Sequence, residues 1–290
     1  MITIQVPATS ANCAIGFDFL GLALSWTSHI SFELAESFII TGCPKAYQGT
    51  DNLVYQSFVA TCQKAQVAVP PLHIHIDSDI PFARGLGSSS QCIAAGICGA
   101  NTLLNLGLSD EEKLDIAVEI EGHPDNVAPA LFGGLCACVP MAKQDQFVRI
   151  KLNANDWKAL LVIPETEIAT KEARRVLPSS LPLKDAALQA GRSFLFSYAW
   201  QQKDETLLYE MCVDKIHEPY RAKLIAQYQD LKILADQYHV PFWISGSGST
   251  MAFVSQREDI LTLLQDQIAK DFPSLQLRRA QVSDSGAEVI

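Results

Sequence analysis

A glycine- and serine-rich segment, which separates a candidate strand from a candidate helix, reads Pro81-Phe82-Ala83-Arg84-Gly85-Leu86-Gly87-Ser88-Ser89-Ser90-Gln91. Glycine lets the backbone approach a ligand closely, and the first turn of the helix that follows directs free N–H groups toward it. The serine hydroxyls supply further donors. The segment therefore predicts a phosphate cradle, with an ordinary tight turn capped by serine as the equal alternative.

Other phosphate-binding motifs do not fit this chain. A Walker A loop requires Gly-Lys followed by Ser or Thr, and the sequence contains no Gly-Lys. A dinucleotide fingerprint requires a third glycine, where this chain has Ser90. The segment belongs to a different class of phosphate site.

Around this segment the hydrophobic pattern alternates between strands and helices. Alternating apolar residues predict strands at 2–6, 30–34 and 72–76. Helices are expected at 52–66, after Ser90 to about residue 104, and at 109–121. In the second half we expect helices at 170–176, 185–201, 205–215, 219–238 and 258–270, with strands at 159–163, 242–244, 251–254 and 275–282. This order predicts an α+β protein of two lobes, residues 1–153 and residues 154–290.

Composition narrows the class of protein. The 290 residues carry a net charge of -10 with no cluster of basic residues, which argues against nucleic-acid binding. No apolar run approaches the roughly 20 residues that span a bilayer, and the first residues lack the basic start of a signal peptide. The eight cysteines include no C-x-x-C pair. We expect a soluble cytoplasmic protein with reduced cysteines and no membrane partner.

Three blocks of the sequence together resemble the GHMP small-molecule kinases. They are Pro7-Ala8-Thr9-Ser10-Ala11-Asn12 with Gly16-Phe17-Asp18, then the glycine segment, then Ile244-Ser245-Gly246-Ser247-Gly248-Ser249-Thr250. A fourth block, Glu121-Gly122-His123-Pro124-Asp125-Asn126-Val127-Ala128-Pro129-Ala130, resembles the homoserine kinase branch of that superfamily. The likeness extends over residues 3–282.

This resemblance implies a fold and a reaction. The fold is a first lobe like domain 2 of ribosomal protein S5, which binds ATP, and a ferredoxin-like second lobe. The reaction is the ATP-dependent phosphorylation of the L-homoserine side-chain hydroxyl in threonine biosynthesis, with Mg²⁺ as cofactor and a homodimer as the assembly. Residues 81–91 would hold the ATP.

The resemblance also assigns roles to single residues. Ser89 and Glu119 are the expected Mg²⁺ ligands, with Glu121 as the second choice for the carboxylate, since hard oxygen donors suit this ion. Asp125 is expected either to take the hydroxyl proton or to orient the hydroxyl. The catalytic residues are then Asp125, Asn126 and Glu119.

The substrate carries an ammonium and a carboxylate, which call for opposite charges. Asn12 and Asp18 suit the ammonium or hydroxyl end, whereas Arg174 and Arg221 suit the carboxylate because a guanidinium binds it in a bidentate manner. The remaining residues of the expected substrate site are His123, which has an equally plausible structural role, together with Thr170, Gly246 and Gly248.

Two departures from the family pattern are visible. The first motif usually continues with glycines after the asparagine, but here Cys13-Ala14-Ile15 precede Gly16. In the third motif Ser247 and Ser249 stand where alanine and proline are usual. The second change exchanges small residues and should keep the turn, whereas the first is expected to alter packing beside the substrate.

Overall fold

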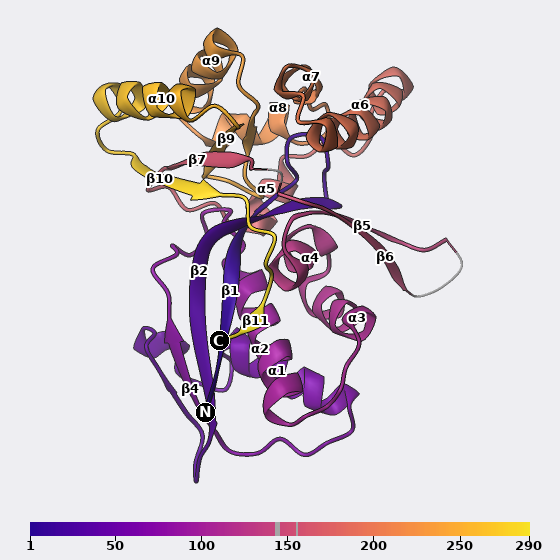
Figure 1. The fold of residues 1–290 in the computed structure, drawn as a ribbon, viewed down its shortest axis with the longest axis vertical. Coiled ribbons are helices and arrows are strands. Elements are labelled where there is room, and N and C mark those ends of the chain that lie inside the picture. The colour runs from indigo at the N-terminus through magenta and orange to yellow at the C-terminus, as the bar shows by residue number, and fades with distance from the viewer. Residues whose placement is uncertain (143–145, 155) are drawn as a thin grey trace.

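The computed structural model describes residues 1–142, 146–154 and 156–290, and in them the chain builds two β-sheets (Figure 1). The first sheet has a central order β11-β1-β2-β4-β3, and β5 pairs with both β2 and β6. Its pairings are antiparallel except for that of β3 with β4. Its strands are β1 (Ile2–Ala11), β2 (Leu20–Leu34), β3 (Ile39–Thr41), β4 (Leu72–Asp77), β5 (Leu135–Pro140), β6 (Phe147–Leu152) and β11 (Glu288–Val289).

Four helices pack against the first sheet, and a short 3₁₀ helix (Lys45–Tyr47) precedes them. They are α1 (Leu53–Lys64), α2 (Ser88–Leu103), α3 (Asp110–Glu121) and α4 (Pro124–Phe132). Buried side chains such as Phe32 of β2, Phe58 of α1 and Ile93 of α2 form the core between them. The capping box predicted at the start of α3 is present, because Ser109 and Glu112 each bond the backbone N–H of the other.

The second sheet is antiparallel, in the order β10-β7-β9-β8. Its strands are β7 (Lys158–Ile163), β8 (Phe242–Ile244), β9 (Met251–Ser255) and β10 (Gln276–Gln281). The helices of this half are α5 (Thr170–Arg175), α6 (Leu183–Gln202), α7 (Glu205–Met211), α8 (Glu218–Arg221), α9 (Tyr228–Tyr238) and α10 (Glu258–Asp271), with a 3₁₀ turn at Ala222–Leu224. Helices α9 and α10 share a buried core with one face of the sheet (Figure 1).

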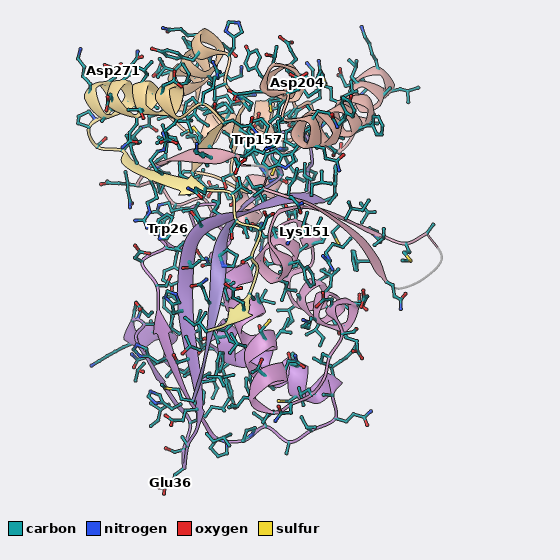
Figure 2. All side chains as sticks on the ribbon, viewed as in Figure 1. Trp26, Glu36, Lys151, Trp157, Asp204 and Asp271 are labelled. Atoms are coloured by element: carbon teal, nitrogen blue, oxygen red, sulfur yellow. The ribbon has the colours of Figure 1, made fainter. Side chains whose placement is uncertain are left out.

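A shared core joins the two halves. Trp26 of β2, Trp157 before β7 and Trp200 of α6 belong to one buried cluster, and Figure 2 shows Trp26 at the end of the first sheet and Trp157 above it in the second half. The rings of Trp157 and Trp200 stack with centroids 5.0 Å apart. Burial of such large rings on both sides fixes the two sheets against each other.

Two predicted helices differ from the structure. The helix expected at 205–215 ends at Met211, because the Asp214 carboxylate accepts hydrogen bonds from the backbone N–H groups of Ile216, His217 and Glu218 and so begins a new turn. The helix expected at 219–238 is broken at Ile225, which is extended and buried in the second core. Burial of this side chain overrides the local helical pattern.

The mixed α+β architecture is confirmed. The division after residue 153 stays a prediction, although β11 lies beyond it in sequence and pairs with β1 of the first sheet. Across the part of the chain that the structure describes, no helix is both long and apolar enough to cross a membrane.

Candidate active site

A cleft between the two halves encloses a cavity of about 430 Å³. Most of the residues expected in the site line it, although they come from distant parts of the sequence. They are Asn12, Asp18, Phe82, Ala83, Arg84, Gly85, Leu86, Gly87, Ser88, Ser89, Gln91, His123, Asp125, Asn126, Thr170, Arg174, Arg221 and Gly246. Four expected residues do not line the cavity: Pro81, Ser90, Glu119 and Gly248.

The glycine segment turns into α2 at the edge of this cavity. Gly87 is the N-cap of the helix with φ of 68°, and a Cβ there would lie 1.9 Å from Thr9 Oγ1. Only glycine meets both the backbone angle and the close approach. Ser88 and Ser89 then form the first turn of α2 and line the cavity, which gives the free N–H groups and hydroxyls that the sequence predicted there.

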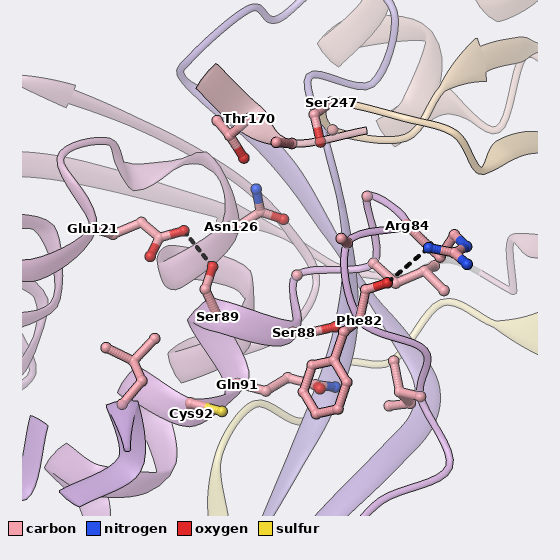
Figure 3. A pocket seen from close by; sticks show the side chains of 18 of the residues that line it. Phe82, Arg84, Ser88, Ser89, Gln91, Cys92, Glu121, Asn126, Thr170 and Ser247 are labelled. Atoms are coloured by element: carbon pink, nitrogen blue, oxygen red, sulfur yellow. Dashed lines mark hydrogen bonds between the residues drawn. The ribbon is translucent and has the colours of Figure 1, made fainter. Parts of the chain in front are cut away.

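The metal pair predicted from the sequence is not brought together. Glu119 is on the outer side of α3, where its side chain is 73% exposed and forms an ion pair of 3.5 Å with Lys64. Glu121 lies beside the glycine segment instead. Ser89 Oγ donates a hydrogen bond of 2.7 Å to Glu121 Oε1 (Figure 3), and Ser90 Oγ donates one of 3.2 Å to the same oxygen. The structure therefore does not place Glu119 beside Ser89, since two residues along a helix turn the side chain by about 200°.

Several contacts hold the glycine segment against the second half of the chain. Ser245 Oγ donates to the Gly85 carbonyl at 2.6 Å, and Arg84 Nε donates to the Pro164 carbonyl at 3.0 Å. Arg84 also forms an ion pair of 3.2 Å with Glu167. The guanidinium of Arg84 is therefore committed to the protein itself. Gly248 lies behind this turn, where a Cβ would meet Ile225, Ile244 and Ile168.

The start of α4 places a buried carboxylate in the cavity. Pro124 is the first residue of the helix, and Asp125 follows it in the first turn, 3% exposed. His123 Nδ1 lies 2.6 Å from Asp125 Oδ1. Burial alone would lower the pKa of His123, but the hydrogen bond and the charge of Asp125 outweigh it and raise that pKa above its usual value.

Asn126 follows in the same helical turn. Its Oδ1 accepts a hydrogen bond of 2.7 Å from Thr9 Oγ1, which leaves the amide N–H₂ to face the cavity. In Figure 3 the Asn126 side chain lies between Ser89 of the glycine segment and Thr170 of α5. It is thus a neutral donor beside the phosphate cradle.

Asp18 and Arg174 form the charged end of the cavity. Arg174 Nη1 and Nη2 donate to the two oxygens of Asp18 at 2.9 and 2.7 Å, a bidentate pair. The hydrogen bond to Asp18 raises the pKa of Arg174. Both side chains are about one-third exposed, so a ligand can reach them.

Arg221 lies deeper at the same end. It is 3% exposed and donates to the carbonyls of Gly246 at 2.8 Å and Ala173 at 3.3 Å. Burial and the neighbouring charge of Arg174 lower its pKa to about 10, which keeps it protonated at neutral pH. The guanidinium groups of Arg174 and Arg221 lie 5.6 and 5.3 Å from the centre of the Phe17 ring.

Asn12 has a structural position beside this pair. Its Nδ2 donates to the Gly246 carbonyl at 2.9 Å and its Oδ1 accepts from the backbone N–H of Asp18 at 3.1 Å. Its amide is therefore used to hold Asp18 and the third motif together. Asn12, Cys13 and Ala14 all have positive φ, of 67, 40 and 60°. Left-handed backbone costs about 1–2 kcal/mol per non-glycine residue, so this loop is strained.

The opposite end of the cavity is apolar and aromatic, and the sequence reasoning missed part of it. Tyr47 and Phe82 are both about half exposed, and their rings lie 5.7 Å apart. Ile30, Ile76 and Ile80 also line this end. Tyr47 is 35 residues before Phe82 in the chain, and no motif marked it. Only the structure identifies Tyr47 as part of the site, because it shows the exposed ring beside Phe82 of the glycine segment.

Comparison with known proteins agrees with this geometry. Residues 52–134 match the model of the GHMP kinases N terminal domain. A homoserine kinase of Clostridium botulinum is 38% identical over 261 residues, which cover 89% of this chain and 88% of that protein. A homoserine kinase of Clostridium beijerinckii is 38% identical over 265 residues, with the same coverage of both chains.

The chain belongs to the homoserine kinase family. The crystal structure of a homoserine kinase from Cytophaga hutchinsonii superposes with a TM-score of 0.87 at 28% identity, and covers 100% of this chain and 97% of that one. A mevalonate kinase from Methanococcus jannaschii has a TM-score of 0.72 at 16% identity, and covers 97% of this chain and 98% of that one. That second likeness shows the fold, which homoserine kinases share with other GHMP kinases.

Proposed function

We propose that this homoserine kinase family member transfers the γ-phosphoryl group of ATP to the side-chain hydroxyl of L-homoserine, which yields O-phospho-L-homoserine for threonine biosynthesis. The observation that carries the proposal is a single cleft with a phosphate cradle between two different ends. One end holds the Asp18–Arg174 pair, and the other is lined by Tyr47 and Phe82. An amino acid suits the first end and a nucleotide base the second.

The ATP lies along the glycine segment in this proposal. The N-terminus of α2 attracts anions because its first N–H groups are unpaired and its dipole is positive there. The base would then extend toward Tyr47 and Phe82, which offer exposed ring faces for stacking. Asn126 would donate to a phosphate oxygen through its amide nitrogen.

The donors beside the cradle fit a Mg²⁺ ion that is shared with the phosphates. Ser89 and Glu121 offer a hydroxyl and a carboxylate 2.7 Å apart. Mg²⁺ usually binds one or two protein carboxylates together with substrate phosphates and water, so a site with few protein ligands suits it. When bound, Mg²⁺ would neutralise the charge that develops on the phosphates.

L-Homoserine would insert its charged groups into the pair formed by Asp18 and Arg174. The ammonium would bind the Asp18 carboxylate, and the carboxylate would bind the Arg174 guanidinium with support from Arg221. Asp18 then contacts the substrate ammonium in place of Arg174, and Arg174 contacts the substrate carboxylate in place of Asp18. The side-chain hydroxyl of the amino acid would extend toward Asp125.

Positioning dominates the chemistry of phosphoryl transfer. The hydroxyl oxygen forms a bond to the γ-phosphorus while the bond from that phosphorus to the β–γ bridging oxygen breaks, and ADP leaves. Asp125 Oδ1 is bound to His123, so the second oxygen of the carboxylate is left to accept a hydrogen bond from the hydroxyl. Asp125 thereby orients the nucleophile, and the hydroxyl proton passes to it or to water as the new bond forms.

The test is ADP release, measured with MgATP and a panel of L-homoserine, L-threonine, L-serine, mevalonate and galactose. We expect strong turnover with L-homoserine alone. Turnover of mevalonate or galactose instead would be consistent with the proposed phosphate cradle but would contradict the assignment of L-homoserine as the substrate. ATP binding without turnover of any alcohol would overturn the proposed reaction and favour a sensor of metabolites.

Membership of the homoserine kinase family also supports a proposal for the location and assembly of the protein. We expect a cytoplasmic homodimer that binds neither nucleic acid nor membrane, in keeping with the net charge of -10. Light scattering coupled to gel filtration measures the assembly, and a mass of one chain would contradict it.

A further inference from the structure

The loop that carries Asn12 and Asp18 has backbone angles that non-glycine residues rarely adopt. Asn12, Cys13 and Ala14 are three successive residues with positive φ, and none of them is glycine. Non-glycine residues rarely adopt such backbone angles unless the surrounding structure imposes them. Contacts with the surrounding structure therefore impose these backbone angles on the loop.

Two buried side chains from the second half of the chain bind this loop at successive carbonyls. His217 Nε2 lies 2.8 Å from the Ala14 carbonyl oxygen, and Gln189 Nε2 donates to the Ile15 carbonyl at 2.9 Å. A carbonyl oxygen only accepts, so His217 donates through Nε2–H. His217 is fully buried and Gln189 is 5% exposed. Both bonds are shielded from water, which strengthens them.

A rigid support lies behind these two donors. Gln189 Nε2 also donates to Asp214 Oδ1 at 2.7 Å. Asp214 Oδ2 accepts the backbone N–H groups of His217 and Glu218 at 2.6 and 2.7 Å. The start of α8 and the middle of α6 are thereby joined to one buried carboxylate, so the two donors move as a unit.

The ring of His217 reaches the charged end of the cavity in a second way. It stacks on Phe17 of the same loop with centroids 5.5 Å apart. The guanidinium groups of Arg174 and Arg221 lie close to the Phe17 ring as well. A shift of the His217 ring would therefore disturb both the loop and the arginines.

We propose that His217 and Gln189 are positioning residues for the amino-acid substrate, which hold the strained loop 12–18 so that Asp18 faces Arg174. The inference rests on the proposed function, because it assigns these residues to the site for the ammonium and carboxylate. It also accounts for the positive φ angles of Cys13 and Ala14, which glycine would adopt more readily. The hydrogen bonds from His217 and Gln189 stabilise backbone angles that glycine would adopt without such support.

The experiment compares two replacements of His217 that carry the same amide donor and differ only in how far it reaches. In His217→Gln the side-chain amide nitrogen reaches about the position of Nε2, whereas in His217→Asn it ends one bond short of it. We expect His217→Asn to raise KM for L-homoserine by roughly 10- to 100-fold, because small displacements of a binding group have effects of that size. KM for ATP should change less than threefold, and His217→Gln should recover most of the loss.

Ser255→Ala is the matched control, because it also removes a side-chain hydrogen bond from the second half, the partly buried one of Ser255 Oγ to Glu205 Oε1 at 2.7 Å. It should lower Tm without raising KM for L-homoserine. Equal KM values in His217→Asn and wild type, or equal increases for both substrates, would overturn the positioning role. If the wild type itself fails to turn over L-homoserine, the proposed function fails, a result that is distinct from failure of this inference.

Discussion

Ser89 Oγ lies 2.7 Å from Glu121 Oε1, and this hydrogen bond joins the first turn of α2 to the last turn of α3. Glu119, two residues earlier on α3, faces solvent and pairs with Lys64 instead. The bond places one carboxylate at the phosphate cradle and leaves the other outside it. The two glutamates therefore differ in their surroundings although they share a helix.

Replacement of these glutamates distinguishes their roles. Glu121→Gln should lower kcat by roughly 100-fold, because it removes a carboxylate proposed to hold the Mg²⁺ that neutralises the developing phosphate charge, and it should raise the Mg²⁺ concentration required for half-maximal rate. Glu119→Gln is the matched control and should leave both values within twofold of wild type. Steady-state rates against Mg²⁺ concentration measure both. A large effect of Glu119→Gln with none of Glu121→Gln would return the metal site to the residue that the sequence favoured.

The Arg174 side chain should matter only for substrates that carry a carboxylate. Arg174→Ala should raise KM for L-homoserine roughly 10- to 100-fold, the size expected for loss of a charged hydrogen-bonded pair. The amino alcohol 3-aminopropan-1-ol lacks the carboxylate, so its weak turnover should be about the same in wild type and variant. An equal loss for the two substrates would mean that Arg174 acts through Asp18 rather than through the ligand.

The contact between His123 and Asp125 predicts a pH dependence of stability. Because the pKa of His123 is raised in the folded state, the stabilisation is fully present below the unfolded pKa and is lost as pH rises through the folded value. The difference in urea midpoint between wild type and His123→Gln should therefore be larger at pH 5.5 than at pH 8.5. A difference that does not vary with pH would show that His123 stays neutral.

Glu218 predicts a second pH dependence, away from the cavity. Burial raises the pKa of Glu218 from 4.5 to about 8, although its Oε1 accepts the Ile244 N–H at 2.7 Å. The folded state retains a proton that the unfolded chain releases, so stability should fall as pH rises from about 4.5 through 8. Glu218→Gln keeps the acceptor and stays neutral. It should match wild type near pH 5 and exceed it in urea midpoint at pH 9, and a lower midpoint at pH 9 would contradict the account.

Most of the cavity lining could be predicted from the sequence, because the motifs mark local structures that depend on few neighbours. Gly87 and the serines after it predict a turn with free N–H groups, which the N-cap of α2 at Gly87 provides. The choice between Glu119 and Glu121 could not be made in this way, since it depends on how α3 is rotated against α2. That rotation is set by packing of the whole helix, and α3 has apolar residues on more than one side.

Contacts between segments that lie far apart in the sequence could not be predicted from local patterns either. The Asp18–Arg174 pair joins residues 156 positions apart, and each was predicted for its own end of the substrate rather than as a partner of the other. The break at Ile225 arises because its side chain is buried against the second sheet, a tertiary effect that local helical spacing does not contain. The contact between the rings of Tyr47 and Phe82 likewise depends on tertiary structure, because the two residues are 35 positions apart in the sequence.

The central claim is that the cleft transfers phosphate to the side-chain hydroxyl of L-homoserine, and its most direct measurement is the identity of the product. The enzyme would be incubated with MgATP and L-homoserine, and the mixture followed by ³¹P NMR, with Glu121→Gln as the control protein. The account predicts a new phosphomonoester signal, split by the adjacent CH₂ group, that grows with ADP and is nearly absent with the variant. Growth of ADP and inorganic phosphate alone, or an acyl phosphate in place of the monoester, would contradict it.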